Sequence, residues 1–235
     1  MASHGKRYRQ ARGTIDREQT YTPVEAVRLL KDAPAAKFDE TVEVHFRLGL
    51  NVRHADEQLR GTIMLPHGTG RSTRVAVFAE GDKAREAEEA GADVVGSADL
   101  AAKIEGGFLD FDVAIATPDQ MGNVGKLGRV LGPRGLMPNP KSGTVTFDIE
   151  RAVSEIKSGR IEFKVDRAGI VHATVGRASF TPDQLRANVA TLVDAINRAK
   201  PTGAKGTYMR TLTLAPTMGP GVRIDIPSAL AAANA

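Results

Sequence analysis

Strand-like and helix-like segments alternate most clearly in residues 74–116, which read RVAVFAEGDKAREAEEAGADVVGSADLAAKIEGGFLDFDVAIA. Short, continuously apolar runs at 75–79, 94–95 and 113–116 are separated by amphipathic segments at 83–90 and 98–104. Apolar strands between helices of this kind are typical of a mostly parallel sheet that is covered on both faces. This part of the chain therefore predicts a small α/β domain that can bury its own core.

The residues before this region follow a different pattern. Thr22 to Glu25 form a capping-box sequence with Pro23 at the first helical position, which predicts a helix over 22–30. Residues 41–48 alternate strictly between apolar and polar side chains, and 61–65 resemble a second strand. One helix and two half-buried strands cannot close a core, so this segment needs a partner.

The residues after the α/β region return to the pattern of the first segment. Apolar runs at 161–165 and 170–175 flank a turn at 166–169, and we expect them to pair as a β-hairpin. A second capping box at 181–184 predicts a helix that ends before Pro201. Further strands are expected at 208–214 and 222–226, followed by an alanine-rich tail that we expect to fray.

Both ends of the chain thus offer uncovered apolar faces, while the middle is self-sufficient. The simplest arrangement is an α+β domain built from 1–67 plus 159–235, with an α/β domain of 68–158 inserted into it. The two crossings contain Pro66, Gly68, Ser158 and Gly159. Since glycine and serine interrupt regular structure there, we expect a two-stranded hinge.

Charge is distributed unevenly along the 235 residues, whose formal net charge is +4. Residues 1–13 carry 4 bases and no acid, and 159–235 carry 10 bases and 5 acids, whereas both segments between them are net acidic. A polyanion would therefore prefer the domain built from the two ends, because neutralised phosphates release counterions. Ordinary solvated surface is the alternative interpretation of these charges.

Several classes of protein are excluded or disfavoured by composition. The chain has no cysteine, so disulfide scaffolds and cysteine-ligated metal sites are excluded. Its longest apolar runs fall far short of the roughly 18 residues that a membrane span needs, and no signal peptide is visible, so we expect a cytoplasmic protein with no membrane partner.

Catalytic and cofactor motifs are also missing from the sequence. The glycines at 122, 125, 128 and 132 match neither phosphate-loop nor dinucleotide spacing, and the five histidines show no metal-ligand spacing. Asp110 and Asp112 are more simply read as solvated residues at a strand entry than as a catalytic pair. We therefore expect no catalytic residue, no cofactor and no metal.

Two Gly- and Pro-rich strings remain, at 131–141 and 217–221. Such strings restrict the unfolded chain and permit unusual backbone angles, so they are costly as mere spacers, although a tight turn would also account for them. Residues 128–138, GRVLGPRGLMP, resemble the signature of the L-one family of large-subunit ribosomal proteins. Segments 37–43, 159–163, 203–206 and 217–220 resemble bacterial members of that family in order and spacing.

The resemblance implies that the two ends form an rRNA-binding domain and that the inserted domain has a three-layer, Rossmann-like α/β fold. It further implies a non-enzymatic structural protein that forms a mobile side stalk near the ribosomal exit site and assists release of deacylated tRNA. Its partners would be large-subunit rRNA, exit-site tRNA and its own operon mRNA, which it would repress. Off the ribosome the protein would be a monomer.

By matched motif, the resemblance also implies which residues contact RNA. The expected residues on the first strand and the late loop are Lys37, Phe38, Thr41, Glu43, Thr217, Met218 and Gly219. The hairpin would add Lys164, Asp166 and His172, while Phe38 is equally compatible with a core position. The family-signature loop comprises Gly132, Pro133, Arg134, Gly135, Met137 and Pro138, for which the sequence suggests no physical role beyond a loop that faces tRNA or the hinge.

A carboxylate such as Glu43 is unfavourable beside phosphate but can accept a hydrogen bond from a ribose 2′-OH, which points to folded RNA. The competing hypothesis is a small-molecule or nucleotide-binding α/β enzyme that uses the sheet edge of the inserted domain. A shift in thermal stability with a cofactor but not with RNA would favour that alternative.

Overall fold

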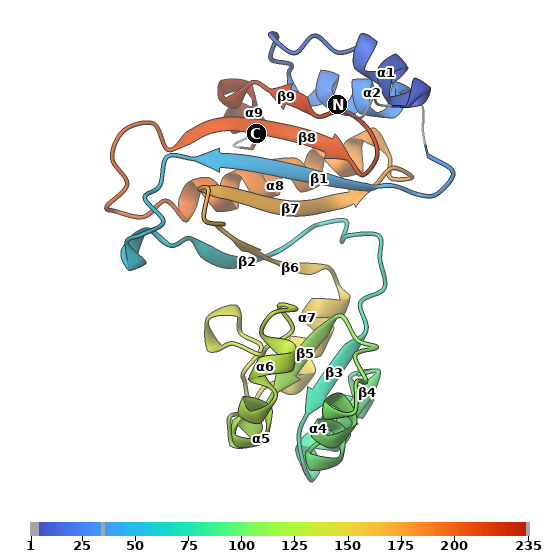
Figure 1. Ribbon diagram of the computed structural model, residues 1–235, viewed down its shortest axis with the longest axis vertical. Coiled ribbons are helices and arrows are strands. Elements are labelled where there is room, and N and C mark those ends of the chain that lie inside the picture. Colours follow the sequence, from blue (N-terminus) through green and yellow to red (C-terminus); the bar gives the residue numbers. More distant parts are fainter. Residues whose placement is uncertain (1–4, 34–35, 234–235) are drawn as a thin grey trace. The chain divides into compact units, whose positions relative to one another are not determined.

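The computed structural model describes residues 5–33 and 36–233. The described chain divides into two compact units (Figure 1), which we call unit 1, up to Gly70 and from Ile161, and unit 2, Arg71–Arg160. Pro66 and Gly68 lie inside unit 1, and Ser158 and Gly159 lie inside unit 2. The mixture of helices and parallel and antiparallel strands confirms the predicted α/β and α+β fold class.

Unit 1 is built on a four-stranded antiparallel sheet with the strand order β7-β1-β8-β9. Its strands are β1 (Thr41–Leu48), β7 (Ile170–Arg177), β8 (Met209–Pro216) and β9 (Val222–Ile224). The central strand β1 comes from the first segment of the chain, and both of its neighbours come from the last. The two chain ends therefore form one structural unit.

Helices cover one face of this sheet. They are α2 (Pro23–Asp32), α8 (Pro182–Arg198) and α9 (Ile226–Ala233), while α1 (Lys6–Gly13) precedes them. Figure 1 shows α8 behind β1 and β7. The buried side chains of α8 and β1 belong to one hydrophobic core. Both predicted capping boxes are present, at Thr22–Glu25 and at Thr181–Gln184, and they fix where α2 and α8 begin.

Two expectations for unit 1 were wrong. Strand β6 (Arg160–Lys164) pairs with β2 (Arg60–Met64), and only one bridge, Val165 to Val171, connects the predicted hairpin arms. After the turn at 166–169 the two arms separate, and β7 pairs with β1 instead of with β6. The alanine-rich tail is helical, because Asp225 accepts a hydrogen bond from the Ser228 N–H at 2.9 Å and the helix packs on α8.

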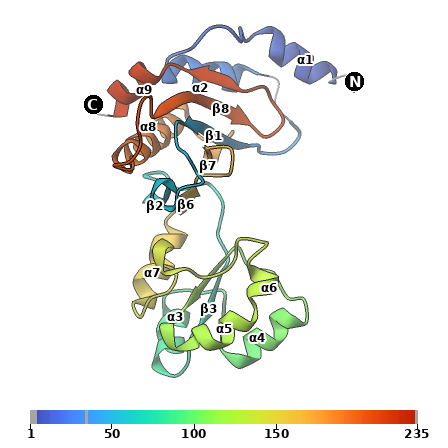
Figure 2. The ribbon, with the colours of Figure 1, turned by 60° about the vertical axis from the view of Figure 1, so that its left-hand side comes forward.

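Unit 2 contains a three-stranded parallel sheet with the order β4-β3-β5 between two helical layers (Figure 2). One core contains side chains of α3 and α7, and the other those of α4, α5 and α6. The element bounds are β3 (Val75–Phe78), α3 (Asp82–Glu89), β4 (Val94–Gly96), α4 (Ala98–Glu105), β5 (Val113–Ala116), α5 (Met121–Lys126), α6 (Gly128–Leu131) and α7 (Ile149–Lys157).

Candidate nucleic-acid interface

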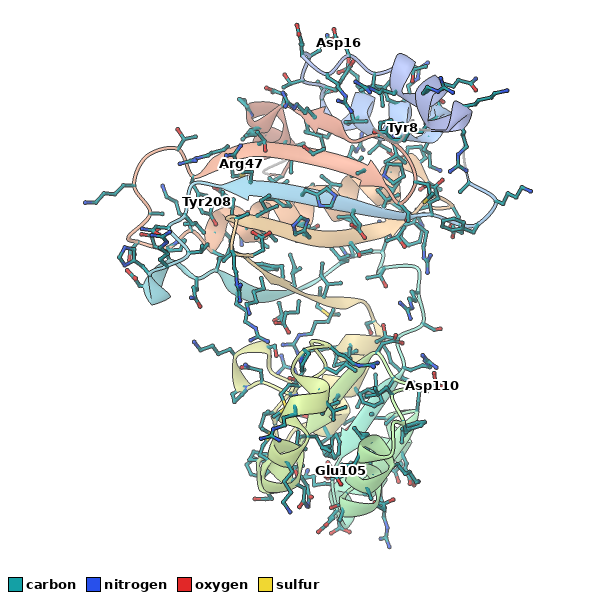
Figure 3. The ribbon with its side chains drawn as sticks, in the orientation of Figure 1. Tyr8, Asp16, Arg47, Glu105, Asp110 and Tyr208 are labelled. Carbon is teal, nitrogen blue, oxygen red and sulfur yellow. The ribbon has the colours of Figure 1, made fainter. Side chains whose placement is uncertain are left out.

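The face of the unit 1 sheet opposite the helices is polar, and we call it the open sheet face. Side chains alternate along β1, so Val42, Val44 and Phe46 are buried while the residues between them point outward. Register places outward residues of β7 and β8 beside them. The open sheet face comprises Thr41, Glu43, His45, Arg47, His172, Thr174, Thr211 and Thr213, and Arg47 is labelled in Figure 3.

A histidine pair lies at the centre of this face. His45 and His172 are directly opposite one another on β1 and β7, and their Nδ1 atoms are 2.8 Å apart. One of the two nitrogens must donate and the other accept, so the pair holds no more than one proton on these two atoms. Burial lowers the pKa of His45, and the neighbouring His172 lowers it further. Sequence reasoning selected His172 but not its partner, since the pair becomes visible only with strand register.

Asp166 organises the turn that presents His172. Its carboxylate accepts the N–H groups of Ile170 at 2.7 Å and Ala168 at 2.8 Å, and these bonds, led by that from Ile170, lower the pKa of Asp166. The other carboxylate oxygen lies 3.6 Å from Nε2 of His172. Gly169 in the same turn has φ +77°, a left-handed conformation that glycine adopts without steric cost. Asp166 therefore holds the turn between β6 and β7 in place. Lys164, at the end of β6, is exposed.

The loops at the amino end of β1 and the carboxyl end of β8 form one assembly. Thr41 and Thr217 are joined by a backbone bond of 3.0 Å, and the Thr217 hydroxyl both accepts from the Thr41 N–H and donates to the Thr41 carbonyl, each at 3.1 Å. The single proton of the Thr217 hydroxyl is therefore already donated within the protein. Gly219 packs against Pro216, where a Cβ would come within 2.5 Å.

Glu40 is the main residue of this assembly that sequence reasoning missed. Its side chain is 4% exposed, and its two carboxylate oxygens accept the N–H groups of Ala36 at 2.7 Å and Met218 at 2.8 Å. It thus connects the loop before β1 to the loop after β8. Its only signal in the sequence is its place inside segment 37–43, where an isolated glutamate does not reveal that it is buried.

Exposed apolar and cationic side chains project from these loops. Phe38 and Met218 are 54% and 51% exposed, which excludes the alternative that Phe38 is a core residue. Lys37 is also exposed. Lys37 and Phe38 were expected on the first strand, but the structure places both in the loop before β1. A lysine, a ring and a thioether beside a polar sheet can contact phosphates, bases and sugars together.

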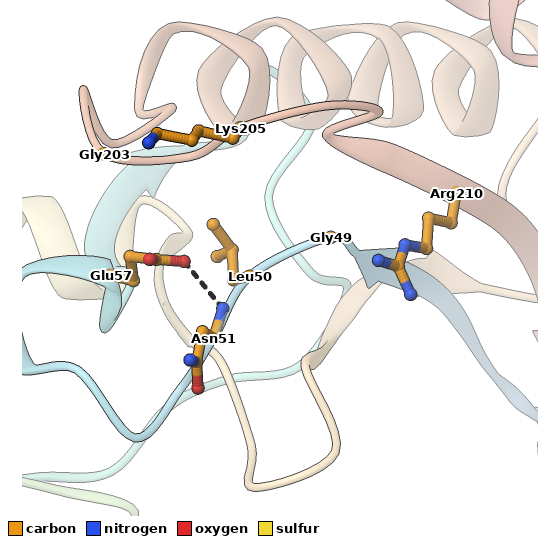
Figure 4. A pocket seen from close by; sticks show the side chains of 7 residues that line it. All are labelled: Gly49, Leu50, Asn51, Glu57, Gly203, Lys205 and Arg210. Carbon is orange, nitrogen blue, oxygen red and sulfur yellow. Dashed lines mark hydrogen bonds between the residues drawn. The ribbon is translucent and has the colours of Figure 1, made fainter.

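A pocket lies at the other end of β1 (Figure 4), and it is lined by Gly49, Leu50, Asn51, Glu57, Gly203, Lys205 and Arg210. The Glu57 carboxylate accepts the Asn51 N–H at 2.6 Å, which holds the loop after β1 in place. Lys205 and Arg210 form no ion pair within the part of the chain that the structure describes. Cations therefore lie at both ends of β1.

Unit 1 carries 20 lysines and arginines against 14 acids, whereas unit 2 carries 12 against 14. A profile of the ribosomal protein L1p/L10e family matches residues 29–220. The chain belongs to this family. As a member it is a ribosomal protein of the large subunit that binds rRNA, and the family indicates a structural, non-enzymatic role.

The family match covers both units and so includes the predicted signature loop. At the carboxyl edge of the unit 2 sheet, where the alternative hypothesis placed a cofactor, the Ser97 hydroxyl contacts both Glu80 and Gln120. Among the described residues, no group of three or more His, Cys, Asp or Glu side chains is arranged to hold a metal ion, and no helix is long and apolar enough to span a membrane.

Proposed function

We propose that the open sheet face and its adjoining loops bind a folded segment of large-subunit rRNA. The observation that carries this proposal is the assembly around Glu40, which presents Lys37, Phe38 and Met218 beside the outward residues of β1. Buried hydrogen bonds fix these loops before RNA arrives, so little conformational entropy is lost on binding. The surplus of cations in unit 1 supplies attraction to phosphate.

The residues proposed to contact RNA are those that the sequence selected, namely Lys37, Phe38, Thr41, Glu43, Lys164, Asp166, His172, Thr217, Met218 and Gly219. Their roles differ. Thr217, Gly219 and Asp166 act mainly by shaping loops, because their polar groups are engaged within the protein or their conformation is required for packing. Lys37, Phe38 and Met218 offer exposed side chains for direct contact.

We further propose that the protein is of the bacterial type and acts in the cytoplasm, as a monomer when it is off the ribosome. Bound to rRNA it forms a mobile stalk that assists release of deacylated tRNA, and it represses its own operon through an mRNA segment that mimics the rRNA site. The stalk's mobility includes rotation of the two units about the crossings near Pro66, Gly68, Ser158 and Gly159. Support for these details is the family membership together with the two-unit architecture.

The test compares the affinity of the full chain for a structured large-subunit rRNA fragment and for an unstructured RNA of equal length. If about five phosphates are neutralised, log K falls by roughly 4 to 5 per decade of salt. Met218→Asp should lower affinity for the structured RNA, while Met64→Asp, which changes a methionine that is 42% exposed on β2, serves as its matched control. Equal affinity for both RNAs, or equal effects of the two substitutions, would refute the proposal.

A further inference from the structure

The pair formed by His45 and His172 lies on the open sheet face, where a ligand can reach it. β1 and β7 place the two residues opposite one another, and Thr213 of β8 lies opposite His45 on its other side. The side chain of His172 is 54% exposed, and His45 is partly exposed. A ligand that covers the open sheet face therefore meets both rings.

The distance between the two rings indicates what lies between them. Their Nδ1 atoms are 2.8 Å apart, and the ring centroids are 4.9 Å apart in an edge-to-face arrangement. Two nitrogens bound to one tetrahedral zinc ion would be about 3.3 Å apart, because each Zn–N bond is about 2.05 Å long. A separation of 2.8 Å matches a hydrogen bond instead. The pair therefore shares one proton between its Nδ1 atoms.

Asp166 favours one of the two ways in which the protons can be arranged. One of its carboxylate oxygens lies 3.6 Å from Nε2 of His172, and a carboxylate there favours a proton on that nitrogen. A neutral His172 that is protonated at Nε2 has a bare Nδ1, which accepts the proton donated by Nδ1 of His45. Neutral His45 then has no proton on Nε2. The uncharged pair thus offers one bare nitrogen, Nε2 of His45, to a further proton.

A proton added at this nitrogen leaves the hydrogen bond between the rings intact. The pair then carries one positive charge, and the Nε2 atoms of both rings are donors. A second added proton would require both Nδ1 atoms to be protonated, which would break the hydrogen bond between them. The pair therefore alternates between charge zero and charge +1, and only the charged state donates from both outer nitrogens.

The charged groups nearest the pair come from β1, β9 and the turn before β7. They are Glu43 and Arg47 on β1, Arg223 opposite Thr213 on β9, and Asp166 in the turn, where Lys164 and Arg167 flank it in sequence. The outward residues of β7 and β8 beside the pair are uncharged, namely Ile170, Thr174, Thr211, Thr213 and Ala215. Burial lowers the pKa of His45, the neighbouring ring lowers it further, and Glu43 raises it by less. In the free protein at neutral pH the pair is therefore mainly uncharged.

We propose that the pair of His45 and His172 binds a phosphate of the rRNA and takes up one proton, at Nε2 of His45, as the phosphate binds. This inference rests on the proposed function, because it needs RNA on the open sheet face. The protonated pair offers the phosphate a positive charge and two N–H donors, whereas the uncharged pair presents a lone pair that repels it. Phosphate binding and protonation therefore favour one another.

Isothermal titration calorimetry of the full chain with the structured rRNA fragment counts the protons directly. The titration is run at pH 7 in MOPS and in Tris, whose ionisation enthalpies differ. An opposite charge within about 4 to 6 Å raises the pKa of a histidine by about 1 to 3, so we expect uptake of roughly half a proton or more per complex. Affinity should fall about 5- to 20-fold between pH 6 and pH 8. Absence of proton uptake would overturn the proposal.

His45→Gln removes the nitrogen that takes up the proton and keeps a polar side chain. Proton uptake should disappear in this variant, and its affinity for the RNA should no longer fall between pH 6 and pH 8. His67→Gln is the matched control, because His67 is an exposed histidine outside the open sheet face, and it should retain both effects. Unchanged uptake in His45→Gln would assign the proton to another group or to an RNA base, and the proposal would be wrong.

Nitrogen NMR of the histidine rings tests the proposal without any substitution. In the free chain at pH 7, Nε2 of His45 should have the chemical shift of a bare nitrogen, and in the RNA complex that of a protonated one. This measurement decides the matter even if His45→Gln does not fold. A bare Nε2 on His45 in the complex would refute the proposal.

Failure of this inference is distinguishable from failure of the proposed function. If RNA binding is specific and is weakened by Met218→Asp but takes up no proton, only the inference about the histidine pair falls. If structured and unstructured RNA bind equally well, the proposed function fails and the inference fails with it.

Discussion

Replacing Asn188 by alanine should destabilise unit 1 strongly, although Asn188 is not one of the residues proposed to contact RNA. Its side chain is fully buried on α8. The amide nitrogen donates to the carbonyls of Val175 at 2.8 Å and Gly68 at 2.9 Å, and the amide oxygen accepts the His67 N–H at 3.1 Å. One side chain thus satisfies three backbone groups from two distant segments.

The Val175 carbonyl carries the largest single part of the expected cost. Register between β1 and β7 shifts at this point, since Val42 pairs with Gly176 and Glu43 with Thr174, so Val175 has no partner on β1. Without Asn188 this buried carbonyl would be left unsatisfied, at a cost of about 1 to 3 kcal/mol. The groups of His67 and Gly68 are partly buried, and each lost bond there costs about 0.5 to 1.5 kcal/mol. We expect a total near 3 kcal/mol.

Hydrogen exchange followed by mass spectrometry measures this effect for unit 1 separately from unit 2. A loss of about 3 kcal/mol should accelerate exchange through global opening of unit 1 by roughly 150-fold, since about 1.4 kcal/mol corresponds to a factor of ten. Asn197→Ala is the matched control, because Asn197 is exposed on the same helix and its change should stay within about 0.5 kcal/mol. A cost below 1 kcal/mol for Asn188→Ala, or similar exchange in both variants, would refute the reasoning.

Three further predictions concern pH and backbone effects. Burial raises the pKa of Tyr208 to about 12, so unit 1 should lose stability as pH rises from about 10 towards 12. Tyr208→Phe should abolish that loss in urea titrations. Near neutrality the variant should be about 1 kcal/mol less stable, because it lacks the 2.9 Å hydrogen bond to the Ile196 carbonyl. The lowered pKa of His45 predicts that the stability of unit 1 falls as pH drops below about 6.5, because the unfolded chain takes up a proton on this histidine first. The same urea titration should show a weaker fall for His45→Asn. An identical fall in both proteins would contradict the role of His45 in this pH dependence. Gly125→Ala should raise the stability of unit 2 by about 0.5 to 1 kcal/mol in thermal unfolding, because its Cβ enters open space, and destabilisation would show that the backbone there is not helical in solution.

Local patterns in the sequence were sufficient to predict most of the fold. The alternation over Thr41–Leu48 gave β1 correctly, and the two capping boxes located the starts of α2 and α8. Both patterns depend only on residues within one helical turn or one strand, so they can be recognised without knowing which segment packs or pairs against them. The parallel unit was predictable for the same reason, because its strands and helices alternate along the chain.

Strand pairing and short helices were harder to predict. The arms of the expected hairpin carry the same alternation whether they pair with each other or with β2 and β1, so periodicity alone could not distinguish these arrangements. Helices α5 and α6 contain glycine at 122, 125 and 128, whose low helix propensity hid them; buried side chains such as Val124 and Leu131 hold them in place. Tertiary packing outweighs propensity there.

The candidate site was predictable only in part, because motif residues and supporting residues leave different signals. Phe38 and Met218 were selected and are exposed as contact residues should be. Glu40 and His45 were not selected, since their importance depends on which N–H groups and which ring lie beside them in space. Two of these partners, Met218 for Glu40 and His172 for His45, lie more than 100 residues away in the sequence and cannot be read from neighbouring positions.

The central position of β1 has a consequence for the order in which a new chain can mature. Both of its neighbours lie late in the sequence, and β7 begins only at Ile170. At a synthesis rate of about 5 to 20 residues per second, the roughly 120 residues between β1 and β7 take about 6 to 25 s to emerge. During that interval all of unit 2 leaves the ribosomal exit tunnel and can fold. Both edges of β1 stay unpaired over the same time, so we expect the nascent amino-terminal segment to bind chaperones.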